Sequence, residues 1–294
     1  MKGIILAGGN GTRLYPMTLG VSKQLLPVGG KPLIYYPLST LMSAGIRDIL
    51  IISTPSDLPR FQSVFGSGES FGLSLSYAAQ AQPHGIAEAF IIAREFICEE
   101  PVTLILGDNV FFGDGLSQRI QAVIEEQPVS GATVFGSRVD HPERFGVLGF
   151  EGNTVISVTE KPEFPASKYA VTGLYLFDSK VVGYAKTLMP SARGELEITD
   201  LLTRYLEQHM LQVELLSLGN AWFDTGTQDS LSEADRFITA LQQQQGICVG
   251  CIEEIALRNR WINIDMIREK IKDYPSNVYI DYLRSLVVEG LRVE

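Results

Sequence analysis

Residues 1–14 read MKGIILAGGNGTRL, a short apolar run that leads directly into a cluster of glycines. The run Lys2–Ala7 has the length and composition of a buried β-strand. It is too short for the apolar core of a signal peptide, so we expect it to remain in the folded protein. Glycines after a buried strand let backbone N–H groups approach phosphate oxygens closely. The segment therefore predicts an α/β protein with an anion-binding loop after its first strand.

This loop differs from the two common phosphate-binding signatures. A Walker A loop requires Gly-Lys-Ser/Thr after four intervening residues, and a dinucleotide-binding loop requires a third glycine where Leu14 stands. Here Thr12 adds a hydroxyl donor, and Arg13 adds a delocalised cation suited to phosphate. The alternative is a tight turn without a ligand, which the Thr-Arg pair and the preceding strand disfavour.

Near-continuous apolar strands alternate with amphipathic helices in the first half of the chain. Strands are expected at Lys2–Ala7, Asp48–Ser53, Leu73–Ala79 and Val102–Leu106, and helices at Lys31–Ala44, Asp57–Phe65 and Ile86–Ile97. This order indicates a parallel sheet covered on both faces. Ligands of such sheets bind outside the carboxyl ends of the strands, so residues 8–13, 80–85 and 108–109 are expected to face the ligand.

The second half has a different pattern, with more strands and a helical end. Strands are expected at Ala132–Val139, Phe145–Phe150, Val155–Glu160 and Tyr169–Phe177, and helices at Ile198–Gln208 and Ser230–Gln244. From about Glu253 the chain is amphipathic and helical, as in accessory or oligomer-forming segments. We therefore expect a catalytic domain at residues 1–240 and a C-terminal helical extension, for oligomerisation or regulation, at residues 241–294.

Composition excludes several classes of protein. The net charge of −10 argues against a general nucleic-acid or acidic-membrane binder. No segment approaches the roughly 20 apolar residues of a membrane span, so we expect a cytoplasmic protein without a membrane partner.

Cys248 and Cys251 form a Cys-x-x-Cys pair, typical of a metal or redox site. With no second pair and no nearby histidine, reduced structural thiols are the simpler interpretation.

Charged residues in three further segments are candidates for chemistry. Lys23 precedes an apolar Leu-Leu-Pro run and could reach phosphates, although most lysines are simply exposed. Asp108 ends a predicted parallel strand, where it could hold Mg²⁺ with a second carboxylate, Asp224; turn or cap aspartates are the alternative. Glu160 and Lys161 could bind a sugar hydroxyl and a phosphate, or form an exposed pair of little energetic weight.

Taken together, these segments resemble the sugar-nucleotide pyrophosphorylases. The resemblance runs from about Lys2 to the end of the chain, and it includes the glycine loop, Lys23–Pro27, Gly107–Asn109, Glu160–Pro162 and Trp222–Gly226. It also includes Tyr35–Leu38, Pro142–Gly146, Ala170–Tyr175 and Arg193–Thr199. So many segments in the same order are more specific than any single motif.

The resemblance implies a fold, a reaction and a set of partners. The fold would be a Rossmann-like nucleotidyltransferase core with a mixed central sheet, a smaller β-rich sugar-binding part and the helical extension. The reaction would transfer a thymidylyl group from dTTP to glucose 1-phosphate with Mg²⁺ as cofactor, at the start of rhamnose-type deoxysugar synthesis for cell-surface polysaccharide. The family also forms homotetramers.

The resemblance also implies roles for individual residues. Those expected to bind the nucleotide are Gly8, Gly9, Gly11, Thr12, Arg13, Gln24, Gln80, Pro83 and Gly85. Those expected to bind the sugar phosphate are Asn109, Gly146, Glu160, Lys161, Val171 and Tyr175. Asp108 and Asp224 would bind the metal, and Arg13, Lys23, Lys161 and Asp108 would be catalytic.

The chemistry agrees with this assignment. The attacking phosphate oxygen is already anionic, so catalysis needs positioning and charge neutralisation rather than a general base. Two alternatives stay open: a relative that uses another base or sugar, and a non-catalytic nucleotide-sensing subunit.

His84 stands where these enzymes usually carry an acidic residue beside the base. Leu218 stands where many carry an arginine near a regulatory nucleotide site, so neither base preference nor regulation follows from the sequence.

Overall fold

The first strand, β1 (Lys2–Ala7), lies inside a nine-stranded sheet. It is parallel to β4 (Asp48–Ser53) on one side and to β6 (Val102–Leu106) on the other, with Leu6 opposite Ile52 and Leu106. Its apolar side chains alternate between two clusters, with Ile4 and Leu6 in one and Ile5 and Ala7 in the other. Because neighbours cover both edges and helices cover both faces, an uninterrupted apolar run is what this position requires.

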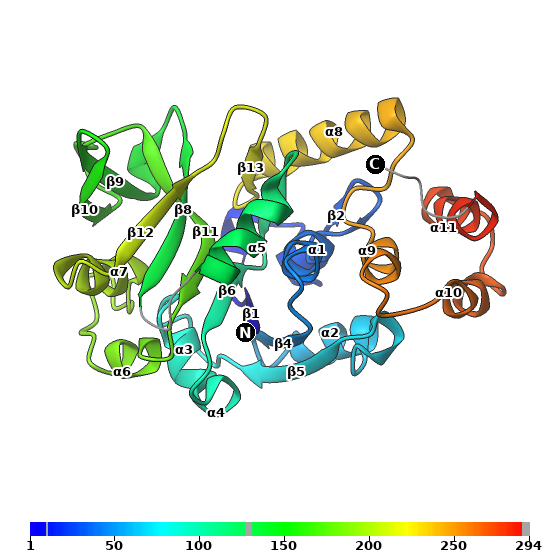
Figure 1. The fold of residues 1–294 in the computed structure, drawn as a ribbon, viewed down its shortest axis with the longest axis horizontal. Helices are drawn as coiled ribbons and strands as arrows, with labels where there is room; N and C mark the ends of the chain where they lie inside the picture. The colour runs from blue at the N-terminus through cyan, green and yellow to red at the C-terminus, as the bar shows by residue number, and fades with distance from the viewer. Residues whose placement is uncertain (10, 127–130, 290–294) are drawn as a thin grey trace.

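The computed structural model of this chain describes residues 1–9, 11–126 and 131–289. Asn10 of the glycine loop and residues 290–294 of the predicted C-terminal extension lie outside the described residues. Figure 1 shows the sheet flanked by helices, with the C-terminal helices gathered at one end of the molecule.

The large sheet has a parallel half and a mostly antiparallel half. Its order is β10-β9-β11-β6-β1-β4-β5, and β8 pairs with both β11 and β12. Strands β1, β4, β5 and β6 are parallel, whereas β11 is antiparallel to β6, β8 and β9. The predicted α/β fold with a mixed central sheet is therefore confirmed. The remaining strands are β4 (Asp48–Ser53), β5 (Ser74–Ala79), β6 (Val102–Leu106), β8 (Ala132–Arg138), β9 (Gly146–Glu151), β10 (Thr154–Glu160), β11 (Tyr169–Phe177) and β12 (Leu211–Leu215).

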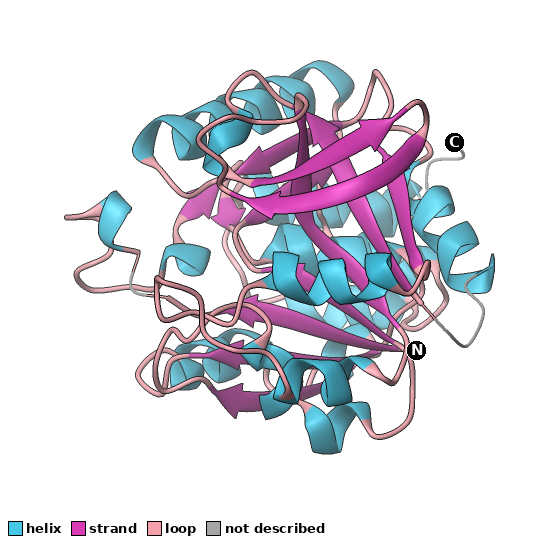
Figure 2. Cartoon of the chain, turned by 90° about the vertical axis from the view of Figure 1, so that its left-hand side faces the viewer, coloured by secondary structure: helices cyan, strands magenta, loops and turns pink. Residues whose placement is uncertain are grey.

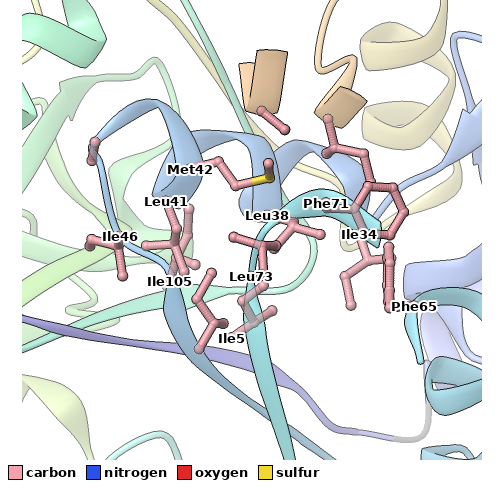
Figure 3. Close-up of a cluster of buried hydrophobic side chains, with 14 of the residues drawn as sticks. Ile5, Ile34, Leu38, Leu41, Met42, Ile46, Phe65, Phe71, Leu73 and Ile105 are labelled. Atoms are coloured by element: carbon pink, nitrogen blue, oxygen red, sulfur yellow. The ribbon is translucent and has the colours of Figure 1, made fainter. Parts of the chain in front are cut away.

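Helices cover both faces of this sheet (Figure 2). On one face, Ile5 and Ile105 pack with Leu38, Leu41 and Met42 of α1, as Figure 3 shows. On the other face, Ile4, Leu6 and Leu104 pack with α3, α6 and α7. The helices are α1 (Tyr35–Ser43), α2 (Leu58–Phe65), α3 (Glu88–Ile92), α4 (Arg94–Ile97), α5 (Leu116–Glu126), α6 (Val181–Lys186), α7 (Ile198–Glu207), α8 (Gln228–Gln245), α9 (Ile252–Arg258), α10 (Ile264–Ile271) and α11 (Val278–Glu289).

Three predicted helices were wrong in extent. The helix expected at Ser230–Gln244 begins two residues earlier, at Gln228, because Thr227 caps its start. The helix expected at Lys31–Ala44 begins only at Tyr35, because Lys31–Pro32 forms strand β3 against β2 (Pro27–Val28). The helix expected at Ile86–Ile97 begins at Glu88 and divides at Ala93, whose ψ of 5° departs from helical geometry. Its first residues are drawn out of the helix because the N–H of Ala87 donates to the carbonyl of Leu196. The predicted strands were confirmed to within one residue.

The C-terminal helices share a core with the sheet. Helix α8 is continuous across residue 240, and Ile252, Ala256 and Ile267 of the helices after it join the same cluster as Ile5 and Leu41. In Figure 1, α9 lies between α1 and the α10–α11 pair. None of the helices described is both long and apolar enough to cross a bilayer.

Candidate functional site

A cavity of about 220 Å³ opens where the parallel half of the sheet meets the antiparallel half. Polar and apolar side chains from both halves line it. Nine of the predicted site residues are among them: Arg13, Asp108, Asn109, Gly146, Glu160, Lys161, Val171, Tyr175 and Asp224. The fold thus brings together residues separated by more than two hundred positions in the chain.

Asp108 and Asp224 converge because a two-stranded ladder joins their segments. β7 (Asn109–Phe112) follows Asp108 directly and pairs antiparallel with β13 (Ala221–Asp224), so that Asn109 lies opposite Asp224. The backbone N–H and the hydroxyl of Thr225 both donate to the carbonyl of Asp108, at 3.2 and 2.7 Å. The two aspartates therefore lie side by side at one wall of the cavity.

Charge around this aspartate pair is unevenly distributed. Burial alone would raise the pKa of Asp108, but the ammonium of Lys23, which is hydrogen-bonded to this carboxylate, holds the pKa below its ordinary value. Burial and the negative charge of Asp108 raise the pKa of Asp224 to about 6. A second cation between the two carboxylates would relieve this repulsion. One or two carboxylates from the protein, with the other ligands supplied by phosphates and water, are the donor set that Mg²⁺ commonly takes.

The glycine loop lies beside the aspartate pair. Gly11 has a φ of +56°, and its carbonyl accepts hydrogen bonds from the N–H of Leu14 and the hydroxyl of Thr18. A Cβ placed on Gly226 would lie 2.7 Å from a guanidinium nitrogen of Arg13 and 3.3 Å from Asp224 Oδ1. Arg13 therefore crosses the turn after Asp224, where the absence of a side chain at position 226 leaves room for its guanidinium.

The remaining residues predicted to bind the nucleotide lie around this loop and outside the cavity. Gln24 is buried, and its amide Nε2 donates to the carbonyl of Gly8 at 3.3 Å. Gln80, at the end of β5, is also buried, and its Nε2 donates to the carbonyl of Gly85 at 3.2 Å. The other members of this set are Gly9, which has open space around it, Thr12, which opens a short 3-10 turn, and Pro83, which is exposed.

Residues of the antiparallel half form a hydrogen-bonded network at the opposite wall. Glu160 accepts from Arg193 Nη2 at 3.0 Å and from the hydroxyl of Thr199 at 3.3 Å, and its carboxylate lies 3.4 Å from Lys161 Nζ. Lys161 has a φ of +40°, and its N–H donates to the carbonyl of Phe145. This backbone bond ties the start of β9 to the end of β10.

Buried polar contacts also hold the floor of the cavity. Asn109 is buried, and its Oδ1 accepts hydrogen bonds from the N–H of Gly173 at 3.1 Å and from Trp222 Nε1 at 2.6 Å. A Cβ on Gly146 would lie 2.8 Å from Thr199 Cγ2, so α7 packs directly on that glycine. Val171 and Tyr175 of β11 are buried beneath the opening.

Sequence patterns assigned no role to four of the side chains in this region. Arg193, Thr199 and Glu197 belong to a segment that carried the family resemblance, and Glu88 lies at the start of α3. Arg193 and Glu197 could have been found from the sequence, because they belong to a group of three charged residues just before the helix predicted at Ile198. No sequence pattern indicates that Glu88 contacts Gln80 at 2.8 Å, because that contact depends on how the loop between them folds.

Comparison with known proteins gives a consistent result. Residues 2–240 match the family model described as nucleotidyl transferase. A glucose-1-phosphate thymidylyltransferase from Neisseria meningitidis serogroup A is 52% identical over 98% of this chain and 99% of its own length. One from Mycolicibacterium smegmatis is 49% identical over the same shares of the two chains.

Solved structures support the same relationship. A Bacillus anthracis protein solved in complex with sucrose superposes with a TM-score of 0.76 at 44% identity, over 81% of this chain and 95% of that chain. A UDP-glucose pyrophosphorylase complexed with UDP-glucose has a TM-score of 0.70 at 24% identity, over 83% and 98%, and so shares the fold. The chain therefore belongs to the nucleotidyl transferase family and, within it, to the glucose-1-phosphate thymidylyltransferases.

Proposed function

We propose that this chain transfers the thymidylyl group of dTTP to glucose 1-phosphate, giving dTDP-glucose and pyrophosphate, with Mg²⁺ as cofactor. The observation that carries the proposal is the position of the aspartate pair. Asp108 and Asp224 lie between a glycine loop suited to phosphates and a cavity with a carboxylate and an ammonium at its far wall. A donor triphosphate and a sugar phosphate could thus meet at one point.

The side chains divide the work by charge. Arg13 and Lys23, beside the glycine loop, would neutralise charge on the α-phosphate and the departing pyrophosphate. Lys161 would hold the attacking phosphate of glucose 1-phosphate, and Glu160 would accept a sugar hydroxyl. Gln80 and Gly85 would contact the base. Asp108 and Asp224 would hold Mg²⁺, which supplies further charge neutralisation when bound.

The positions of these groups also explain why the reaction needs no proton acceptor. A phosphate monoester is an anion at neutral pH, so its oxygen attacks the α-phosphorus once it is held in line with the leaving group. Within the described residues, no histidine lines the cavity. The same proposal includes the homotetramer, the cytoplasmic location and the place in deoxysugar synthesis that the resemblance implies.

The test is release of pyrophosphate from glucose 1-phosphate and Mg²⁺ with dTTP, UTP, CTP, ATP and GTP in parallel. We expect dTTP to give the highest kcat/KM. A preference for another triphosphate would move the base assignment and leave the reaction class. No release with any triphosphate, from protein shown to be folded by circular dichroism, would contradict the proposal. Light scattering on the same sample tests the tetramer.

A further inference from the structure

The orientation of the Gln80 amide is fixed by its hydrogen-bond partners. Its NH₂ group donates to two oxygens, the carbonyl of Gly85 at 3.2 Å and Glu88 Oε2 at 2.8 Å. A carbonyl and a carboxylate can only accept, whereas an amide carries a donor end and an acceptor end of nearly the same shape. The reversed amide would place its oxygen against two other acceptors. Only one of the two orientations is therefore compatible with these neighbours.

The oxygen end of the same amide faces the glycine loop. A Cβ placed on Gly8 would lie 2.8 Å from Gln80 Oε1, so the absence of a side chain at position 8 leaves room beside this oxygen. In the described part of the chain, no donor is hydrogen-bonded to Oε1. The buried amide thus presents one acceptor toward the region where the nucleotide would lie.

Glu88 is itself held in place. It is the first residue of α3, and its side chain is 22% exposed. While Oε2 accepts from Gln80, Oε1 lies 3.0 Å from His84 Nδ1. The carboxylate is therefore contacted at both oxygens by residues on the two sides of the loop. Rotation of the Gln80 amide would break two hydrogen bonds and set an acceptor against this carboxylate.

We infer that Glu88 is a positioning residue that fixes the Gln80 amide with its oxygen toward the base, and that the enzyme thereby selects bases with an N3–H. The inference rests on the proposed function. Thymine and uracil carry a donor at N3, whereas cytosine carries an acceptor there. Two facing acceptors leave both groups unpaired, and this is the situation that discriminates strongly between substrates.

The experiment compares kcat/KM for dTTP, dUTP and dCTP between the wild type and Glu88→Gln. The new amide can turn its NH₂ toward Gln80, so that only the carbonyl of Gly85, at 3.2 Å, still opposes reversal of the Gln80 amide. The reversed amide could then donate to N3 of cytosine. We expect the preference for dTTP over dCTP to fall by about tenfold, the value of one such hydrogen bond. The preference for dTTP over dUTP should not change, because these bases differ only by the C5 methyl group.

Two further variants make the result specific. Glu95→Gln is the matched control: it makes the same change of charge on α4, at a side chain that is 86% exposed and pairs only with Arg94 among the described residues. It should leave every ratio unchanged. Glu88→Leu removes the acceptor altogether and should lower the dTTP/dCTP preference as Glu88→Gln does. With two variants at position 88, the inference can still be tested if one of them fails to fold.

The possible outcomes separate this inference from the proposed function. A wild type with no dTTP-dependent activity overturns the proposed function, and the inference with it. A wild type that prefers dTTP, with Glu88 variants that keep the wild-type dTTP/dCTP ratio, overturns the inference alone. An equal loss with all three triphosphates would show a structural role and would also overturn it.

Discussion

The two walls of the proposed site differ in the groups that they would offer to a ligand. The parallel half presents a glycine loop, in which the backbone at Gly9 is not covered by side chains and Arg13 supplies one guanidinium. The antiparallel half presents side chains that are bonded to one another, with Glu160 contacted by Arg193, Thr199 and Lys161. Backbone N–H groups suit phosphates, which are alike in every nucleotide. Side-chain networks suit sugars, whose hydroxyl groups must be distinguished by direction.

The aspartate pair lies at the wall beside the glycine loop, but its two members do not both come from the parallel half of the sheet. Asp108 follows a parallel strand, and Asp224 arrives on a strand more than one hundred residues later. Their convergence depends on the small β7–β13 ladder. We therefore expect substitutions at the aspartate pair to lower kcat. Substitutions at the wall of the antiparallel half, here called the sugar wall (Glu160, Lys161, Arg193 and Thr199), should change KM for one substrate only. Substitutions where the two halves pack together should lower the free energy of unfolding.

The largest effect is expected at the aspartate pair. Asp108→Asn and Asp224→Asn should each lower kcat by about 10²- to 10³-fold, because each removes charge that the proposed metal needs. Folding should persist, since asparagine keeps the shape of the side chain. The assay is pyrophosphate release over a range of Mg²⁺ concentrations. Asp140→Asn, at a side chain that is 93% exposed, is the control. Near-normal kcat at low Mg²⁺ would show that the metal lies elsewhere.

A smaller effect, limited to one substrate, is expected at the sugar wall. Lys161→Ala should raise KM for glucose 1-phosphate by about 10- to 100-fold, as expected for loss of a hydrogen bond to a charged group. KM for dTTP should change little. Lys168→Ala removes a lysine whose side chain is 58% exposed beyond the same hairpin, and it should change neither constant. Equal increases in both KM values would remove Lys161 from the sugar side.

A substitution at Gly85, which packs against Leu196, should affect the stability of the fold. The φ of Gly85 is +106°, and a Cβ there would lie 2.4 Å from the carbonyl oxygen of Leu196. Gly85→Ala should therefore lower the free energy of unfolding by about 1–3 kcal/mol. Gly45→Ala is the matched control, because Gly45 has a φ of +81° but open space around it, and it separates backbone strain from steric overlap. Urea unfolding measures both variants, and equal losses would mean that the contact with Leu196 can yield.

Sequence patterns correctly predicted the strands and helices whose formation depends on the local sequence. β1, β4, β6 and β11 were predicted to the residue, because buried strands need continuous apolar runs. The start of α1 was missed because Lys31 is buried in a hairpin and its ammonium donates to Gln242 of α8. That partner lies over two hundred positions away, so it leaves no pattern in the sequence around position 31.

The candidate site shows the same difference between residues marked by a local pattern and residues placed by long-range contacts. Glycine spacing and charged residues at strand ends were enough to indicate Arg13, Asp108 and Lys161 from the sequence. Arg193, Thr199 and Glu88 were missed because their roles come from which side chains they contact. These contacts arise from the packing of α7 on β10 and from the docking of residues 84–87 on Leu196. Long-range packing of this kind leaves no periodicity in the sequence.

The smallest predicted effect concerns one hydroxyl group of the sugar wall. Thr199 is buried, and its hydroxyl donates to Glu160 at 3.3 Å while its methyl group packs near Gly146. Thr199→Val keeps the methyl group and the volume and removes only the donor. We expect KM for glucose 1-phosphate to rise by about threefold to tenfold, because a neutral hydrogen bond contributes roughly 1 kcal/mol. kcat with saturating substrates should change little.

Thr203→Val is the matched control for this variant, because Thr203 lies one turn later on α7 and its hydroxyl donates to two backbone carbonyls, those of Thr199 at 2.8 Å and Val158 at 3.5 Å, and not to Glu160. It removes the same group without touching Glu160, and it should leave KM for glucose 1-phosphate at the wild-type value. If both variants raised KM equally, α7 would act only as packing for the sugar wall. If neither did, Arg193 and Lys161 would be sufficient to hold Glu160, and the network would tolerate the loss of its weakest bond.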